Sequence, residues 1–218
     1  LGIEPAAPLP DTLLKITRAR LEEWDPRIPP DRQPLREIVP VIRLYYTGII
    51  NARLGEFTLA ERQASLMEST AHTIRLSDVA DAMARSVRAA IAYYKGDMEE
   101  VVRVTDDMHP RFPSAYYNRV YQVTEGRTFQ AEALFQVGRN RDALTWFEWG
   151  PTASAIDMVG LKEFRRGQIY DRLGDADKAI EHYGKFLKVW ANADPEWQFR
   201  LDEARDRIAA LGGTLVTQ

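Results

Sequence analysis

The sequence of 218 residues contains no cysteine. Its absence excludes disulfide bonds, zinc sites built from thiolates and any enzyme that uses a cysteine nucleophile. A chain without cysteine also suits a reducing compartment. At this length the protein can bury a hydrophobic core of ordinary size, so its fold can depend on packing rather than on cross-links.

Long apolar runs are missing as well. No run approaches the roughly 20 residues that a helix needs to cross a bilayer, and no charged segment followed by an apolar stretch marks a signal peptide. Together with the absence of cysteine, this predicts a cytoplasmic protein with no membrane association. The chain begins with Leu1 rather than Met, so we expect it to be part of a longer protein with further domains upstream.

Positive charge is not in excess, because the formal net charge is -3. Proteins that bind nucleic acid usually carry a basic stripe, so we expect no nucleic-acid partner. The composition, with 45% hydrophobic and 28% charged residues, is that of an ordinary globular domain.

Motifs that carry enzyme chemistry are scarce. The three histidines, His72, His109 and His182, have no second histidine at the spacing of a zinc site. No phosphate-binding loop, dinucleotide glycine motif or Gly-x-Ser-x-Gly segment occurs. The nearest approach to an acid–base cluster is Asp106 and Asp107 with His109, which is more simply interpreted as solvated surface at a helix end. We therefore expect no enzymatic activity, no cofactor and no metal ion.

What the sequence does contain is a repeat. Four segments share a glycine followed by a polar residue, namely Leu54-Gly55-Glu56, Lys95-Gly96-Asp97, Val137-Gly138-Arg139 and Leu173-Gly174-Asp175. The glycines are 41, 42 and 36 residues apart, and periods of this size indicate stacked supersecondary units. Each glycine ends one helical pattern and another begins at once, so each unit is predicted to be a helical hairpin with a left-handed glycine at its turn.

Small side chains accompany each turn. Seven residues before the turn glycine lie Gly48, Ala89, Ala131 and Gly167, and five residues after it lie Ala60, Val101, Ala143 and Ala179. Small residues at these positions allow two helices to approach closely. The pattern therefore predicts an all-α fold in which the two helices of each hairpin pack tightly against each other.

We divide the chain into three parts: residues 1–37 with a helix at about 11–24 and a proline-rich loop, residues 38–192 with the hairpins, and residues 193–218 with a terminal helix and tail. The hairpins are predicted at about 38–72, 78–109, 114–150 and 155–192. The segment 116–137 is either one long helix or two helices broken at Gly126. Asp194-Pro195 is predicted to start the terminal helix, at about 195–211, with a cap followed by proline at the first helical position.

The last hairpin resembles a tetratricopeptide repeat, through Gly167-x-x-Tyr170, Leu173-Gly174-Asp175 and Ala179-x-x-x-Tyr183. The resemblance extends over about 38–192 and implies a right-handed α-solenoid whose terminal helix caps the stack. The stretch 131–211 is similar to the C-terminal repeat regions of large bacterial signalling proteins that carry a serine/threonine kinase or a transcription-regulator domain. The resemblance implies a regulatory or scaffolding role, in which a peptide or protein partner binds in a concave groove lined by the first helix of each hairpin.

Carrying the groove positions over hairpin by hairpin gives eight candidate partner-binding residues: Tyr45, Arg53, Tyr93, Tyr94, Glu132, Phe135, Gln168 and Arg172. Tyrosine and arginine are enriched among binding hot spots. The simpler alternative is that the aromatic residues pack against the next hairpin and that the arginines suit the negative end of a helix. The groove positions that hold asparagine in chaperone-binding repeats are Ile49, Ala90, Glu132 and Gln168 here, so no carboxylate clamp of that kind is expected.

Two other functions stay open from the sequence. An exposed apolar patch on the first hairpin or on the terminal helix would make the chain a homodimerisation module. A pocket lined by Tyr93, Tyr94 and Phe135 would make it a small-molecule sensor domain of a larger protein. The four tryptophans of the C-terminal half, of which Trp190 and Trp197 are two, are interpreted as packing between hairpins.

Overall fold

The structure is a computed structural model, and it describes residues 10–74, 77–108, 124–148 and 156–214. Within these ranges the protein is all-helical, with ten α-helices, one 3₁₀ turn and no strand. The helices are α1 (Asp11–Glu23), α2 (Gln33–Arg53), α3 (Phe57–Ala71), α4 (Ser77–Tyr94), α5 (Met98–Val104), α6 (Thr124–Gln136), α7 (Asn140–Glu148), α8 (Ile156–Arg172), α9 (Ala176–Val189) and α10 (Gln198–Ala210), with the 3₁₀ turn η2 (Pro195–Trp197) before the last.

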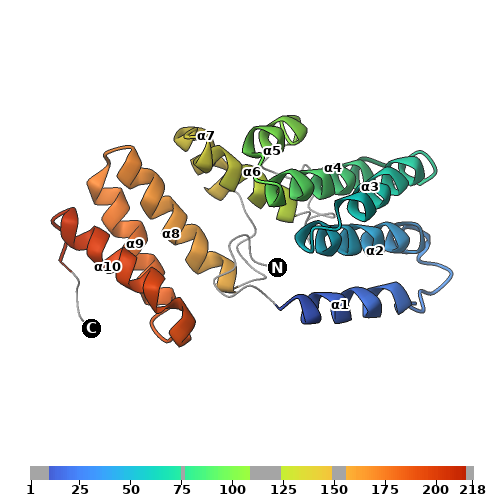
Figure 1. Cartoon of the computed structure of the whole chain (residues 1–218), viewed down its shortest axis with the longest axis horizontal. Helices are drawn as coiled ribbons and strands as arrows, with labels where there is room; N and C mark the ends of the chain where they lie inside the picture. Colours follow the sequence, from blue (N-terminus) through green and yellow to red (C-terminus); the bar gives the residue numbers. More distant parts are fainter. Residues whose placement is uncertain (1–9, 75–76, 109–123, 149–155, 215–218) are drawn as a thin grey trace.

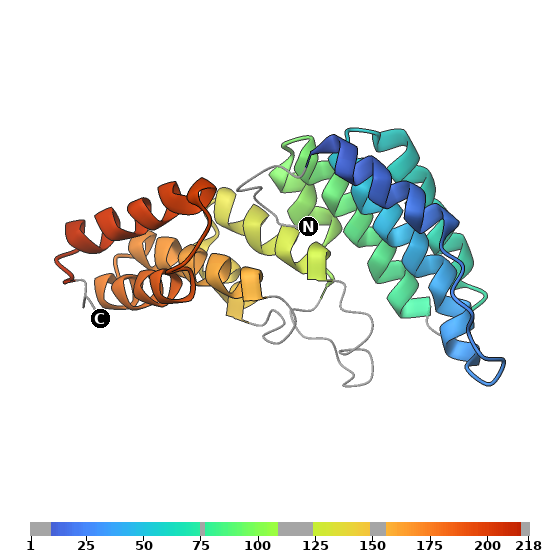
Figure 2. The ribbon, with the colours of Figure 1, turned by 90° about the horizontal axis from the view of Figure 1, so that it is seen from below.

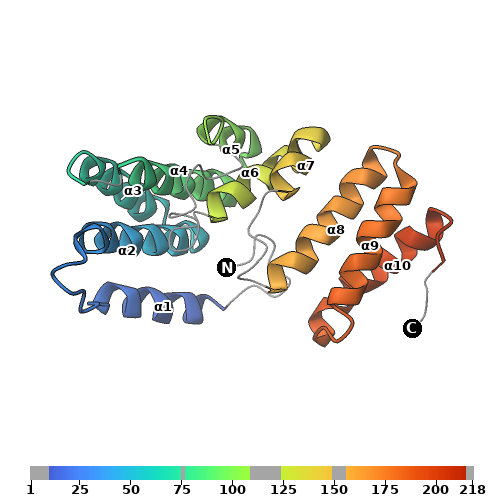
Figure 3. The same cartoon turned by 180° about the vertical axis from the view of Figure 1, so that it is seen from behind.

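The helices follow one another from one end of an elongated molecule to the other (Figure 1). Helices α2 and α3, α4 and α5, α6 and α7, and α8 and α9 pair as hairpins. The second helix of each hairpin also packs against the first helix of the next, as α3 does on α4 and α7 on α8. Helix α10 packs on α9 at the far end. Figure 3 shows α8, α9 and α10 side by side.

Helix α1 adds to the first hairpin by packing along α2 (Figure 2). It buries Leu14, and Arg18 donates a hydrogen bond of 2.6 Å to Asn51 and forms an ion pair with Glu56. Since Glu56 lies in the turn after α2, this arginine fixes α1 against that end of the first hairpin.

The predicted turn glycines end their helices as expected. Gly55, Gly96, Gly138 and Gly174 have φ between 77° and 81°, a region that costs a side chain steric energy. After Gly174, the Asp175 amide donates back to the Tyr170 carbonyl over 2.9 Å, which is the long bond of a Schellman cap. The same backbone bond follows the other three glycines, so all four turns share one geometry.

Small residues also lie where helices meet. A Cβ added to Gly167 of α8 would lie 2.6 Å from Cδ1 of Tyr183 on α9, and one added to Gly48 of α2 would lie 2.9 Å from Val87 on α4. Either distance is shorter than a van der Waals contact allows. The absence of a side chain at these two positions therefore sets how closely the helices approach.

The apolar core is divided into two clusters. The first runs through α2 to α7 and includes Ile169 of α8. The second joins α8, α9 and α10 through Phe164, Tyr183 and Phe186. The ring of Phe164 lies 5.8 Å from that of Tyr183 and 5.0 Å from that of Phe186, between ring centroids, so the second cluster is largely aromatic.

Most helix boundaries match the sequence-based ranges, but α2 begins at Gln33 rather than at about 38, inside the segment predicted as a proline-rich loop, because proline is tolerated in the first turn of a helix. The helix predicted at 11–24 is α1. Gly126 lies inside α6, where its Cα faces Ser86 of α4, so it does not break the helix; residues 109–123 lie outside the described part. The predicted start of the terminal helix at Pro195 was wrong, because 195–197 form a 3₁₀ turn, Asp194 makes no capping side-chain bond and α10 begins at Gln198.

Candidate functional site

The candidate residues of the first hairpin differ in their exposure. The ring of Tyr45 is 1% exposed and lies in the first core cluster beside Tyr46, with 5.1 Å between the ring centroids. A partner could not contact this ring without opening the core. Arg53, at the end of α2, is half-buried, and its Nη1 has no hydrogen-bond acceptor among the described residues.

Tyr93 and Tyr94 end helix α4 and are both half-buried. Their rings meet edge to face at 5.5 Å, and they lie 5.1 Å and 6.0 Å from the buried ring of Phe129 on α6. Such aromatic contacts stabilise the junction of two helices. The tyrosines therefore pack between hairpins and still present part of their surface to solvent.

Glu132, Phe135, Gln168 and Arg172 come together where α6 meets α8. Glu132 is 3% exposed, and its carboxylate accepts hydrogen bonds from both Nε and Nη2 of Arg165, the first over 2.9 Å. A bidentate pair of this kind is the strongest geometry for an arginine and a carboxylate. Glu132 is thus committed to a partner inside the protein.

Phe135 is buried under two guanidinium groups of α8. The guanidinium carbon of Arg172 lies 3.6 Å from the centroid of the Phe135 ring, and that of Arg165 lies 4.7 Å away. Arg172 Nη1 also donates a hydrogen bond of 2.9 Å to the Phe135 carbonyl oxygen. Within the described residues this is the only hydrogen bond that Arg172 donates, and its side chain is exposed.

The polar side chains that meet between α6 and α8, called the polar row below, continue to α10. Gln168 accepts a hydrogen bond of 2.5 Å from Arg165 and donates one of 2.9 Å to Glu203. One turn further on, Arg207 donates to both carboxylate oxygens of Asp171, at 2.7 Å and 2.9 Å. Hydrogen bonds between charged and amide side chains therefore join α8 to α10.

Only part of this row could be predicted from the sequence. Arg165, Glu203 and Arg207 were not among the predicted residues. The available signal was spacing: residues 165, 168 and 172 differ by three and seven, so they share one face of α8. Nothing in a single sequence indicates which residues of α6 and α10 lie opposite that face.

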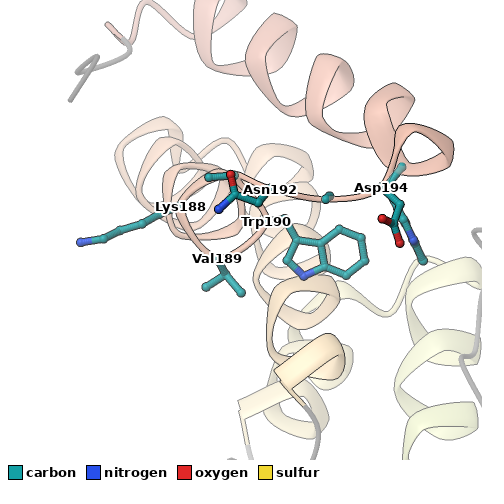
Figure 4. Close-up of a pocket in the computed structure, with 8 residues that line it drawn as sticks. Lys188, Val189, Trp190, Asn192 and Asp194 are labelled. Atoms are coloured by element: carbon teal, nitrogen blue, oxygen red, sulfur yellow. The ribbon is translucent and has the colours of Figure 1, made fainter.

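Two of the C-terminal tryptophans form one contact beside an open cavity. Trp190 and Trp197 meet edge to face with 4.3 Å between their ring centroids, and Trp190 is 9% exposed. A cavity of about 290 Å³ lies beside them at the corner between α9 and η2. In Figure 4 the indole of Trp190 lies at the cavity, whereas Lys188 points away. Trp146 packs on the first core cluster, and Trp149 lies outside the described residues.

The polar groups that sequence analysis considered for catalysis have structural partners. His182 Nδ1 lies 2.6 Å from Glu163, which also accepts from Arg166 at 2.7 Å. The His182 ring is stacked on Tyr170, with planes 7° apart. Asp107 is paired with Arg85 at 3.1 Å, and His109 lies outside the described residues. In the described ranges no three His, Asp or Glu side chains are grouped to hold a metal ion.

No helix in the described part of the chain has both the length and the hydropathy required to cross a bilayer. Comparison of the chain with protein-family models, with curated proteins and with solved structures gave no match. The geometry of the described residues is therefore the basis for a functional assignment.

Proposed function

We propose that this chain is a tetratricopeptide-type helical-repeat module that binds a segment of another protein along the first helices of its hairpins. The observation that carries the proposal is the exposed guanidinium of Arg172. It is held over Phe135 by stacking and by one backbone hydrogen bond, and it keeps donors available at the surface.

The fold proposed for this function is a right-handed superhelix of four hairpins capped by α10. The packing of α3 on α4, α5 on α6 and α7 on α8 supports it, since each hairpin meets only its neighbours in such a stack. The four identical glycine turns and the close approach at Gly48 and Gly167 support it further. Stacked hairpins present their first helices on one side, which gives an extended surface for a partner.

In this mechanism Arg172 binds a carboxylate of the partner. A guanidinium already held in place loses little side-chain entropy on binding, and its planar donors match a carboxylate in bidentate fashion. The half-buried Tyr93 and Tyr94 supply apolar contact further along the groove. Glu132 and Phe135 act indirectly, because they hold Arg165 and Arg172 and are themselves buried.

The experiment is affinity capture from a lysate of the source organism, with the wild-type chain and Arg172→Ala as baits and mass spectrometry as the readout. We expect a protein that the wild type retains and the variant loses. Arg141→Ala, which removes an exposed arginine of α7, is the matched control and should retain the same protein. Circular dichroism checks that both variants keep their helix content.

A partner captured equally by the wild type and Arg172→Ala would contradict the role of this arginine. Loss of the partner with Arg141→Ala as well would indicate non-specific charge attraction. A direct titration of the captured protein with each bait then gives the affinity difference, for which we expect at least a tenfold loss with Arg172→Ala.

A second candidate function, self-association, is favoured by one observation on the first hairpin. Leu59 and Leu66 are 47% and 45% exposed and lie seven residues apart on the same face of α3. Light scattering over a concentration series tests this function. A dimer that Leu66→Glu dissociates would support it, and a monomer at all concentrations would exclude it.

A further inference from the structure

A second cavity lies at the opposite end of the chain from the row on α8. Its volume is about 370 Å³, and it is bounded by residues 24–28 of the α1–α2 connection and by one stripe of α2. The stripe consists of Arg36, Val39, Pro40 and Arg43, whose spacing of three, four and seven places them on one helix face. Sites for small ligands in proteins commonly measure about 300–1,000 Å³.

Three arginines line this cavity, and they are Arg27, Arg36 and Arg43. No ion pair is formed by any of them with the described residues, and Arg43 donates one long hydrogen bond of 3.4 Å to the Trp24 carbonyl oxygen. The lining has one carboxylate, that of Asp25, and it forms no ion pair with the three guanidinium groups. The cavity therefore carries a net positive charge that the described protein does not neutralise.

Several arginines elsewhere in the chain are paired with carboxylates. Arg88 is paired with both Glu61 and Glu68, Arg165 with Glu132, and Arg207 with Asp171. Arg27, Arg36 and Arg43, in contrast, line one hollow without a carboxylate partner among the described residues, in a protein of net charge -3. Bringing like charges together is unfavourable unless a counter-charge is present.

We infer that this cavity binds a small organic molecule carrying a carboxylate or phosphate group. Guanidinium groups bind either oxyanion in bidentate fashion, so three arginines in the lining of one cavity favour an oxyanion ligand. Apart from Asp25, the remaining lining is apolar or aromatic, since Trp24, Ile28, Val39 and Pro40 contribute to it. That wall suits the carbon body of an organic anion better than it suits a fully hydrated inorganic ion.

The test is isothermal titration of the full chain with two probes, phenyl phosphate and benzene-1,3,5-tricarboxylate, at fixed ionic strength. We expect saturable binding of at least one probe at one site per chain, and the better probe identifies which oxyanion the site prefers. Arg36→Ala should weaken that binding at least tenfold, because it removes a charged hydrogen-bond donor. Arg62→Ala is the matched control, since it removes an exposed arginine of α3 outside the cavity, and it should change the affinity less than twofold.

Two results would overturn the inference. One is the absence of saturable heat with both probes. The other is an equal loss of affinity with Arg36→Ala and Arg62→Ala, which would mean that the probes respond to overall charge. Arg36 lies on the exposed face of α2, so its replacement should leave the fold intact. Conservative replacement by Arg36→Lys provides a further check, since a point charge without the bidentate fork should restore binding only in part.

Discussion

Arg165 of α8 lies between Glu132 and Phe135 of α6: its Nε donates to Glu132 over 2.9 Å, and its guanidinium carbon is 4.7 Å from the centroid of the Phe135 ring. The side chains of Arg165 and Glu132 are 11% and 4% exposed, so the pair is shielded from water. Both an ionic contact and a cation–π contact thus join the third hairpin to the fourth through one residue.

Removal of the Glu132 charge should weaken this junction. In Glu132→Gln the nearly buried guanidinium of Arg165 loses the charge of Glu132, and we expect the free energy of unfolding to fall by about 3 kcal/mol. Urea denaturation followed by circular dichroism measures the change. Asp142→Asn, which breaks the exposed pair with Arg139, is the control and should cost at most about 0.5 kcal/mol. Equal losses of unfolding free energy in the two variants would mean that the shielded pair stabilises the protein no more than the exposed pair does.

Two glycines in the last hairpin should respond to alanine in opposite directions. At Gly167 the new Cβ would meet the buried Tyr183 ring at 2.6 Å, and overpacking of this kind costs about 1–3 kcal/mol. At Gly184, inside α9, nothing lies within 4 Å of the new Cβ. Since alanine has the higher helix propensity, Gly184→Ala should stabilise the protein by about 0.5–1 kcal/mol. Thermal or urea unfolding of both variants tests the pair, and destabilisation by both would contradict the packing described for α9.

Substitution of Gly174 tests the effect of backbone strain without a change in packing. Its φ is 77° and no atom lies within 4 Å of an added Cβ, so any cost of Gly174→Ala comes from the left-handed conformation. We expect a loss of about 1 kcal/mol. Gly174→Asn should cost less, because asparagine tolerates this conformation better than alanine does. If alanine and asparagine were equally neutral, the turn would not need its positive φ.

Lys162 should make the stability depend on pH in the alkaline range. Burial, with a smaller contribution from the charge of Arg166, lowers the pKa of Lys162 from 10.5 to about 8. Between these values the unfolded chain holds a proton that the folded chain has released, so this group's contribution to stability rises with pH. Below pH 8 the folded protein must hold a half-buried charge, which is unfavourable.

The variant Lys162→Met isolates this effect. It should be more stable than the wild type at pH 7, and the difference in unfolding free energy should shrink as the pH approaches 9.5. Urea denaturation at the two pH values measures it, with Lys15→Met on the exposed side of α1 as the control for removing a lysine. A difference that stays constant between pH 7 and 9.5 would contradict the lowered pKa.

Local features of the fold could be predicted from the sequence, and contacts between distant residues could not. The turn glycines are predictable because a positive φ is a property of the glycine and its immediate neighbours. The burial of Tyr45 and the pairing of Glu132 with Arg165 depend on how one hairpin sits on another, which the sequence alone does not specify. The start of α10 was misjudged because Asp-Pro is compatible with both a 3₁₀ turn and an α-helix.

For the candidate site, the residues were found more readily than their roles. Groove positions carried over from the resemblance to a tetratricopeptide repeat gave Gln168 and Arg172 on α8, and both do lie in the polar row with Glu132 and Phe135. Spacing cannot show that Phe135 lies beneath Arg172, since that contact joins residues 37 positions apart. It also gave no indication of the arginine-lined cavity, because Arg27 comes from a loop and its position depends on where α1 packs.

The two separate apolar clusters have a consequence for how the chain opens. Helices α8, α9 and α10 exclude water from their own aromatic core, and α2 to α7 exclude it from theirs, with Ile169 and the charged contacts of Arg165 and Arg172 between them. Since Ile169 is the one described residue of α8 that is buried in the first cluster, we expect unfolding of either half to expose little of the other half's core, so that the two halves open as separate cooperative units. Amide hydrogen exchange should then show different protection in the two halves, and we expect any bending of the molecule to occur at the boundary between α6 and α8, where both cores can stay closed to water.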